Sequence, residues 1–238
     1  MVNPKRNVLT TNPRDITITL GGAAVFAALA AVLTLARASV PFPLIPYLQI
    51  DFAELPIMIS FFLFGPFAGI MTELVHWLFL NETGSDVPLG PAIKLVAVLS
   101  TFLGFWLGSV VYSRLGLGTG KRRALGLSLM FGLGSFLRIA AMTVVNYFVL
   151  VYIGPVLFGI NYMAFAKSTL VATTGWQFNA DAAVLFWVLV FTALYNVINL
   201  LVASIPAGLI VSPLTNSYKH MTSFETWLMR SLSAQSAN

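Results

Sequence analysis

Long apolar runs fill most of this chain and restrict the folds that are open to it. A helix that spans a lipid bilayer needs roughly 20 mostly apolar residues. Hydrophobic residues make up 58% of the 238-residue chain and charged residues only 9%, whereas a typical soluble domain is about 25% charged. A soluble fold of this length could not hide so much apolar surface. The sequence therefore predicts an all-α membrane protein that forms one helical bundle.

Six membrane-spanning helices are expected, at about residues 16–35, 52–64, 67–80, 92–112, 124–153 and 182–211. The second and third are short for a full span, so we expect them to tilt or to extend into the loop at 41–49. The Ala-Arg-Ala sequence at 36–38 resembles a signal-peptide cleavage site, but the preceding apolar run exceeds the roughly 7–15 residues of a signal peptide. We therefore expect a transmembrane domain at 16–212, flanked by tails at 1–15 and 213–238.

The positions of the basic residues support an even number of helices. Six helices place both ends of the chain on one side, together with these nine basic residues: Lys5, Arg6, Arg14, Arg114, Lys121, Arg122, Arg123, Lys219 and Arg230. The positive-inside rule makes that side cytoplasmic. The expected outer loops at 38–50, 81–91 and 154–181 are longer than the inner turn at Gly65 and Pro66. This asymmetry suggests a pocket that opens outward.

Several ionisable residues lie in or beside the apolar runs. Asp51 and Glu54 stand at the mouth of the second run, Glu73 and His76 share a helix face because they are three residues apart, and Arg138 lies mid-helix. Ionisable groups at membrane depth cost at least a few kcal/mol unless they are paired or hydrated. A structural Glu73–Arg138 pair, a proton relay and direct ligand contact are the interpretations open for these groups.

Polar side chains in the later helices are candidates for ligand contact. Asn146, Asn196 and Asn199 lie in otherwise apolar helices, and a buried carboxamide needs partners for two donors and an acceptor. Such groups either form hydrogen bonds between helices or form hydrogen bonds with the donors and acceptors at the edge of a heterocyclic ligand. Lys94, at the outer start of the fourth helix, can reach water or a ligand.

Small residues recur every four positions in the first helix, at Ala23, Ala27 and Ala31. This spacing makes a flat face that packs inside the bundle or docks to a separate membrane protein. The basic GLGTGKR segment at 116–122 lacks the P-loop pattern, and the chain has no HExxH, CxxC or GxSxG motif. We therefore expect no ATPase, metal, cofactor or nucleophile site, no enzymatic activity and no nucleic-acid partner.

Five motifs carry a resemblance to a known family: PYLQIDFAELP at 46–56, FGPFAGI at 64–70, Gly90-Pro91, NYFVL at 146–150 and LYNVIN at 194–199. With their spacing, they resemble the substrate-binding (S) components of energy-coupling factor (ECF) vitamin transporters, especially the riboflavin-binding type, over about 16–212. The resemblance implies a six-helix subunit in a prokaryotic plasma membrane that binds its vitamin from outside. It also implies an EcfT membrane scaffold and two ATPase subunits as partners.

The resemblance also assigns residues. It implies ligand contact for Tyr47, Leu48, His76, Lys94, Asn146, Asn196 and Asn199, and docking to the scaffold for Ala23, Ala27 and Ala31. The riboflavin type has Lys-Asn where this chain has His76-Trp77, Asn where Lys94 lies, and Lys where Asn199 lies.

These departures leave the ligand open. Compared with the riboflavin type, this chain lacks a lysine in the last helix and has an additional lysine in the fourth. The change is either a compensating exchange around the same flavin or the mark of a pocket for another vitamin or precursor, such as pantothenate or a thiamine precursor. A solitary proton-coupled permease that uses Glu73, His76 and Arg138 is the alternative outside this family.

Overall fold

A computed structural model describes residues 13–83, 87–115, 123–218 and 226–233 of the chain. Its elements, in order, are α1 (Pro13–Leu35), β1 (Ser39–Phe42), β2 (Ile45–Asp51), α2 (Glu54–Phe64), α3 (Pro66–Thr83), α4 (Leu89–Arg114), α5 (Arg123–Phe148), the π-helix η2 (Val149–Phe158), α6 (Tyr162–Thr174), α7 (Asp181–Tyr218) and α8 (Trp227–Ser233). The described part is mostly helical, as the sequence predicts.

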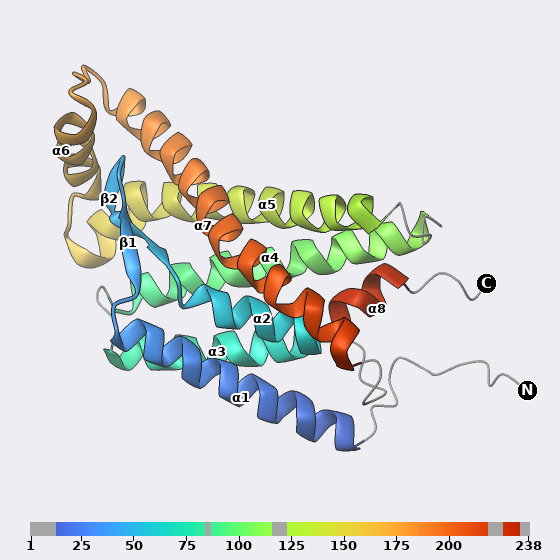
Figure 1. The fold of residues 1–238 in the computed structure, drawn as a ribbon. Helices are drawn as coiled ribbons and strands as arrows, with labels where there is room; N and C mark the ends of the chain where they lie inside the picture. Colours follow the sequence, from blue (N-terminus) through green and yellow to red (C-terminus); the bar gives the residue numbers. More distant parts are fainter. Residues whose placement is uncertain (1–12, 84–86, 116–122, 219–225, 234–238) are drawn as a thin grey trace, which may run out of the picture.

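The long helices form a bundle with two distinct ends (Figure 1). The β1–β2 hairpin and α6 lie at one end, and the start of α1, the end of α7 and α8 lie at the other. Among the described residues, four helical segments are long and apolar enough to cross a membrane: Ile16–Leu35, Leu89–Arg114, Arg123–Phe158 and Asp181–Pro213. α2 is a shorter apolar helix that turns back into α3.

The turn between α2 and α3 depends on glycine. Gly65 has a φ of 101°, in the left-handed region, and its N–H donates to the carbonyl of Phe61 at 2.8 Å. A side chain there would be strained and would meet the Trp227 indole at 2.8 Å. Pro66 then begins α3, a position where its missing N–H costs nothing. The Gly-Pro pair therefore makes the tight hairpin that the sequence predicts.

Two of the expected outer loops, at 38–50 and 154–181, contain secondary structure. The segment at 38–50 contains an antiparallel hairpin in which Ser39 pairs with Asp51 and Pro41 with Gln49. The fifth helix was expected to end near 153, but its winding continues as η2 to Phe158. The expected loop beyond it contains α6.

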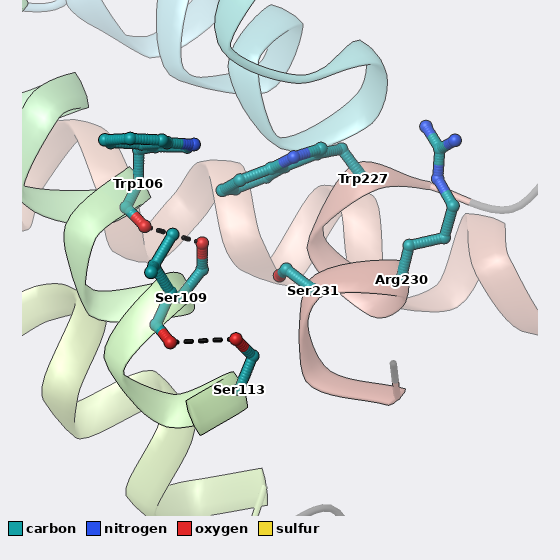
Figure 2. Close-up of a pocket in the computed structure, with 7 residues that line it drawn as sticks. Trp106, Ser109, Ser113, Trp227, Arg230 and Ser231 are labelled. Atoms are coloured by element: carbon teal, nitrogen blue, oxygen red, sulfur yellow. Dashed lines mark hydrogen bonds between the residues drawn. The ribbon is translucent and has the colours of Figure 1, made fainter. Parts of the chain in front are cut away.

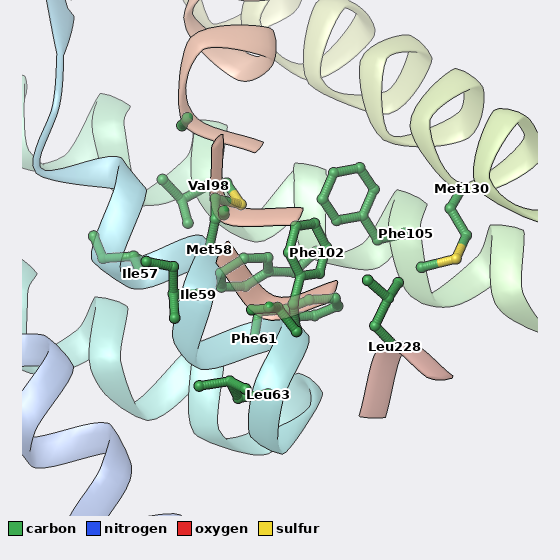
Figure 3. Packing of buried hydrophobic residues seen from close by; sticks show 14 of the residues in the cluster. Ile57, Met58, Ile59, Phe61, Leu63, Val98, Phe102, Phe105, Met130 and Leu228 are labelled. Atoms are coloured by element: carbon green, nitrogen blue, oxygen red, sulfur yellow. The ribbon is translucent and has the colours of Figure 1, made fainter. Parts of the chain in front are cut away.

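An aromatic-rich hydrophobic core lies between α2, α4, α5, α7 and α8 (Figure 3). The rings of Phe61 and Phe102 stack at 4.4 Å between centroids, and Trp227 meets Phe61 edge-on at 4.8 Å. Leu228 and Leu232 of α8 are also buried. The segment predicted as a tail therefore contains a short helix that packs against α2 and α4.

Close helix contact at a second glycine holds α4 against α5. A Cβ atom at Gly104 would lie 2.5 Å from the Cα of Gly134 and 2.5 Å from the carbonyl oxygen of Leu133. Small residues permit this approach between membrane helices, and it brings α4 and α5, which carry Lys94 and Arg138, into close packing.

Candidate ligand-binding site

A cavity of about 480 Å³ lies between the hairpin and the helices α2, α4, α5, α6 and α7. Five of the predicted ligand-contact residues line it: Tyr47, Leu48, Lys94, Asn146 and Asn196. The other two, His76 and Asn199, are absent from its wall. Pockets for small ligands commonly have volumes of about 300–1,000 Å³ and combine apolar walls with a few polar groups. The cavity is therefore of the size and kind that holds a small organic molecule.

A buried ion pair forms part of the cavity wall. Arg138 donates from Nη1 to Glu54 Oε2 at 2.8 Å and from Nη2 to Glu54 Oε1 at 3.0 Å, and each side chain is only 2% exposed. Two parallel bonds of this kind are the strongest arrangement between a guanidinium and a carboxylate.

Of the interpretations left open by the sequence, the structural Glu73–Arg138 pair is wrong, because Arg138 is paired with Glu54. Glu54 was expected at the mouth of the second apolar run, and it is indeed the first residue of α2, but its side chain is buried in the bundle.

The two asparagines of α7 have different positions relative to the cavity. Asn196 Oδ1 accepts from Arg138 Nε at 3.0 Å, and its Nδ2 donates to the Thr192 carbonyl at 2.8 Å. Asn199 lies behind the wall, where Nδ2 donates to Glu54 Oε1 at 2.8 Å and Oδ1 accepts from the Asp51 N–H at 3.1 Å. Asn199 therefore supports the wall from behind.

A second ion pair joins α4 to the hairpin. Lys94 Nζ donates to Asp51 Oδ2, and Asp51 Oδ1 accepts from the Ala53 N–H at 2.7 Å. Both Lys94 and Asp51 line the cavity. Because Asn199 bonds to Asp51 and Glu54, a continuous polar network runs from Lys94 to Asn196 and connects α4, β2, α7, α2 and α5.

Glu73 and His76 share a face of α3, as the sequence predicts, but that face meets α1. His76 Nε2 lies 2.9 Å from Thr34 Oγ1, and its Nδ1 lies 3.8 Å from Glu73 Oε2. Both side chains are fully buried. The structure thus places His76 in the packing between α1 and α3, with no contact to the cavity.

Aromatic residues cover the cavity at the hairpin end. Tyr47 in β2 packs on Phe165 in α6 with 5.4 Å between ring centroids, and Thr173 in α6 donates to the Leu44 carbonyl at 3.0 Å. Tyr195 in α7 donates to the Gln49 carbonyl at 2.7 Å.

The small residues of α1 face two ways. Ala23 and Ala27 are buried inside the bundle, where the Ala23 carbonyl accepts from Thr72 at 3.3 Å. Ala31 is half-buried, and the neighbouring Ala24 and Ala28 are exposed. Packing within the bundle therefore accounts for Ala23 and Ala27. The exposed side of α1 carries Ala24 and Ala28 instead.

A second hollow of about 290 Å³ lies at the opposite end, between α4 and α8 (Figure 2). The hydroxyls of Ser109, Ser113 and Ser231 point to it but donate to carbonyls of their own helices at 2.7–2.8 Å. Trp106 and Trp227 form its apolar sides. Since its hydroxyl donors are already used, we assign no ligand to this hollow.

Comparison with protein families gives a match over most of the chain. The model of the family described as "ECF transporter, substrate-specific component" matches residues 19–216. The chain is also similar to the riboflavin transporter RibU of Staphylococcus aureus (strain TCH60), with 28% identity over 196 residues. That alignment covers 82% of this chain and 95% of the relative.

A solved structure has the same fold. It is described as the S component of a bacterial ECF transporter, and it superposes with a TM-score of 0.61 at 24% sequence identity. The match covers 86% of this chain and 99% of the other. The two chains therefore share a fold.

Proposed function

The chain belongs to the family of substrate-specific components of ECF transporters, and from this premise we propose that it binds riboflavin and selects it for uptake. Membership makes it a multi-pass membrane protein and a substrate-binding transport subunit. The riboflavin assignment is supported by the Staphylococcus aureus relative, a riboflavin transporter that aligns over 95% of its length.

The cavity has the groups that a flavin requires. Riboflavin combines a flat ring with apolar faces, a pyrimidine edge of alternating donors and acceptors, and a polar ribityl chain. The aromatic rings of Tyr47 and Phe165 provide flat surfaces at the covered end. Asn146 Nδ2 and Asn196 Nδ2 each donate one N–H to a carbonyl of their own helix, and Asn196 Oδ1 accepts from Arg138. Each carboxamide keeps a second N–H and a lone pair that can bond to the edge of a heterocycle. This combination in one cavity is the observation that carries the proposal.

Two departures from the riboflavin type lie beside the acidic residues of the wall. Lys94 donates to Asp51 and Asn199 donates to Glu54. An amine at either position would therefore meet a carboxylate of the same wall. This proximity favours a compensating exchange around the same flavin over a pocket for another vitamin.

We further propose six membrane spans, with both ends of the chain in the cytoplasm and the cavity facing outward. The arrangement in Figure 1 supports this topology, because α1 begins and α7 ends at the end of the bundle opposite the hairpin. Arg114 and Arg123 end α4 and begin α5 at that same end, as the positive-inside rule requires of a cytoplasmic face. The membrane is then the bacterial plasma membrane.

Energy for uptake is proposed to come from an EcfT-type scaffold and two ATPase subunits. The GLGTGKR segment, which lies outside the described residues, lacks the P-loop pattern. The exposed side of α1, with Ala24 and Ala28 beside the half-buried Ala31, offers a small-residue surface for docking to the scaffold.

Uptake of labelled riboflavin tests the proposal. Cells that lack their own riboflavin transport should accumulate the vitamin when this chain is expressed together with an ECF module, and an ATPase variant of that module should abolish the uptake. Reconstituted vesicles containing this chain alone should take up no riboflavin under a pH gradient. Uptake under that condition would instead identify a proton-coupled permease.

A further inference from the structure

The charges that line the cavity cancel. Among the described residues of its wall, two are acidic, Asp51 and Glu54, and two are basic, Lys94 and Arg138. Each base is bonded to one of the acids. A ligand that enters the cavity therefore meets ion pairs that are already complete.

The Glu54–Arg138 pair cannot provide a cation for a ligand. Arg138 uses Nη1 and Nη2 on Glu54 and Nε on Asn196, and it is only 1% exposed as a residue. Turning the guanidinium toward another anion would leave the Glu54 carboxylate buried and uncompensated, which costs several kcal/mol. This pair is fixed by its own geometry.

The Asp51–Lys94 pair is less enclosed. Its side chains are 24% and 16% exposed, and the ammonium is carried on a flexible four-carbon stem. Lys94 is thus the cation of the described cavity wall that could move to a ligand. Asp51 is itself held in place, since Oδ1 accepts from the Ala53 N–H and its own N–H donates to Asn199.

We propose that Asp51 is a specificity-determining residue: by neutralising Lys94, it restricts the cavity to uncharged flavins and excludes their phosphate esters. This inference rests on the proposed function. A phosphate monoester carries a charge near −2 at neutral pH, and entry would bury that charge beside Asp51 and Glu54 with no uncommitted cation. Lys94 carries a single positive charge that Asp51 already neutralises, so a bound phosphate would leave uncompensated negative charge in the wall. The free vitamin therefore enters and its 5′-phosphate does not.

Quenching of flavin fluorescence by the purified full-length protein provides the test. Dissociation constants for riboflavin and riboflavin 5′-phosphate would be measured for the wild type, for Asp51→Asn and for Asp51→Asn combined with Lys94→Met. The asparagine keeps an oxygen that can accept from the Ala53 N–H but removes the negative charge. The double variant also removes the cation, so it separates the release of Lys94 from any change of shape at position 51.

The wild type should prefer riboflavin over its phosphate by at least about 100-fold, as expected when a buried charge lacks a partner. Asp51→Asn should reduce that preference about tenfold or more, because Lys94 becomes available, and the double variant should restore it. A wild-type preference below about tenfold, which is about 1.4 kcal/mol, would overturn the inference.

An unchanged preference in Asp51→Asn, or a reduced preference that persists in the double variant, would also overturn it. These results are distinguishable from failure of the proposed function. If the proposed function were wrong, the wild type would bind neither riboflavin nor its phosphate, and the inference would be refuted together with the function. Equal binding of both flavins would refute only the selectivity assigned to Asp51.

Discussion

Glu54→Gln is the substitution that most directly probes the polar network. The Glu54 carboxylate accepts three hydrogen bonds, two from Arg138 and one from Asn199, at 2.8–3.0 Å. Glutamine keeps the shape but has one acceptor oxygen, and its amide N–H groups would face donors. Arg138 would then remain charged, buried and without its counterion.

Loss of one partner from a buried ion pair costs about 3–5 kcal/mol. The 2% exposure of both side chains places this pair in that class. For a chain of this size each kcal/mol corresponds to about 2–4 °C in the melting temperature, so a fall of roughly 6–20 °C is expected. Size-exclusion chromatography after heating the detergent-solubilised protein would measure it.

Two comparisons make the result specific. Glu82→Gln changes an exposed carboxylate near the end of α3 and should leave the melting temperature unchanged. Glu54→Leu combined with Arg138→Met replaces the whole pair with apolar groups and should recover most of the lost stability, because no buried charge remains. If Glu54→Gln melts within about 2 °C of the wild type, the pair does not hold the wall of the cavity together.

Three further substitutions test other parts of the structure. Gly104→Ala should lower the melting temperature by several degrees because its Cβ would meet α5 at 2.5 Å, whereas Gly132→Ala, with open space around it, should not. Trp227→Ala should cost about 2–4 kcal/mol of stability and leave riboflavin affinity unchanged, because α8 lies at the far end of the bundle; weaker binding would place α8 in the ligand site. Asn146→Ala should weaken riboflavin binding about 10–100-fold. Asn81→Ala, which removes a similar amide-to-carbonyl bond within α3, should leave binding intact.

The helical framework could be predicted from the sequence because its signals are local. Apolar runs locate the long helices, and the Gly65-Pro66 pair marks the hairpin. The hairpin at 39–51, α6 and α8 could not be predicted in the same way. The outer segments lack a clear periodicity, and α8 has only seven residues, too few to show an apolar face.

The site was predicted only in part, because its pairing depends on how helices rotate against one another. Arg138 and Glu54 are 84 residues apart, and either Glu54 or Glu73 was available as its partner from spacing alone. Asn196 and Asn199 share a side of α7, but three residues advance a helix by about 4.5 Å along its axis. That shift is sufficient to leave one asparagine on the cavity and the other behind its wall.

The central claim is that a flavin occupies the cavity bounded by Lys94, Arg138 and Asn146. Identification of the molecule that co-purifies with the chain in mild detergent, by absorption spectroscopy and mass spectrometry, tests it most directly. We expect the flavin absorption spectrum and the mass of riboflavin at one molecule per chain. A monodisperse preparation that carries a different vitamin, or that fails to bind added riboflavin, would contradict the claim.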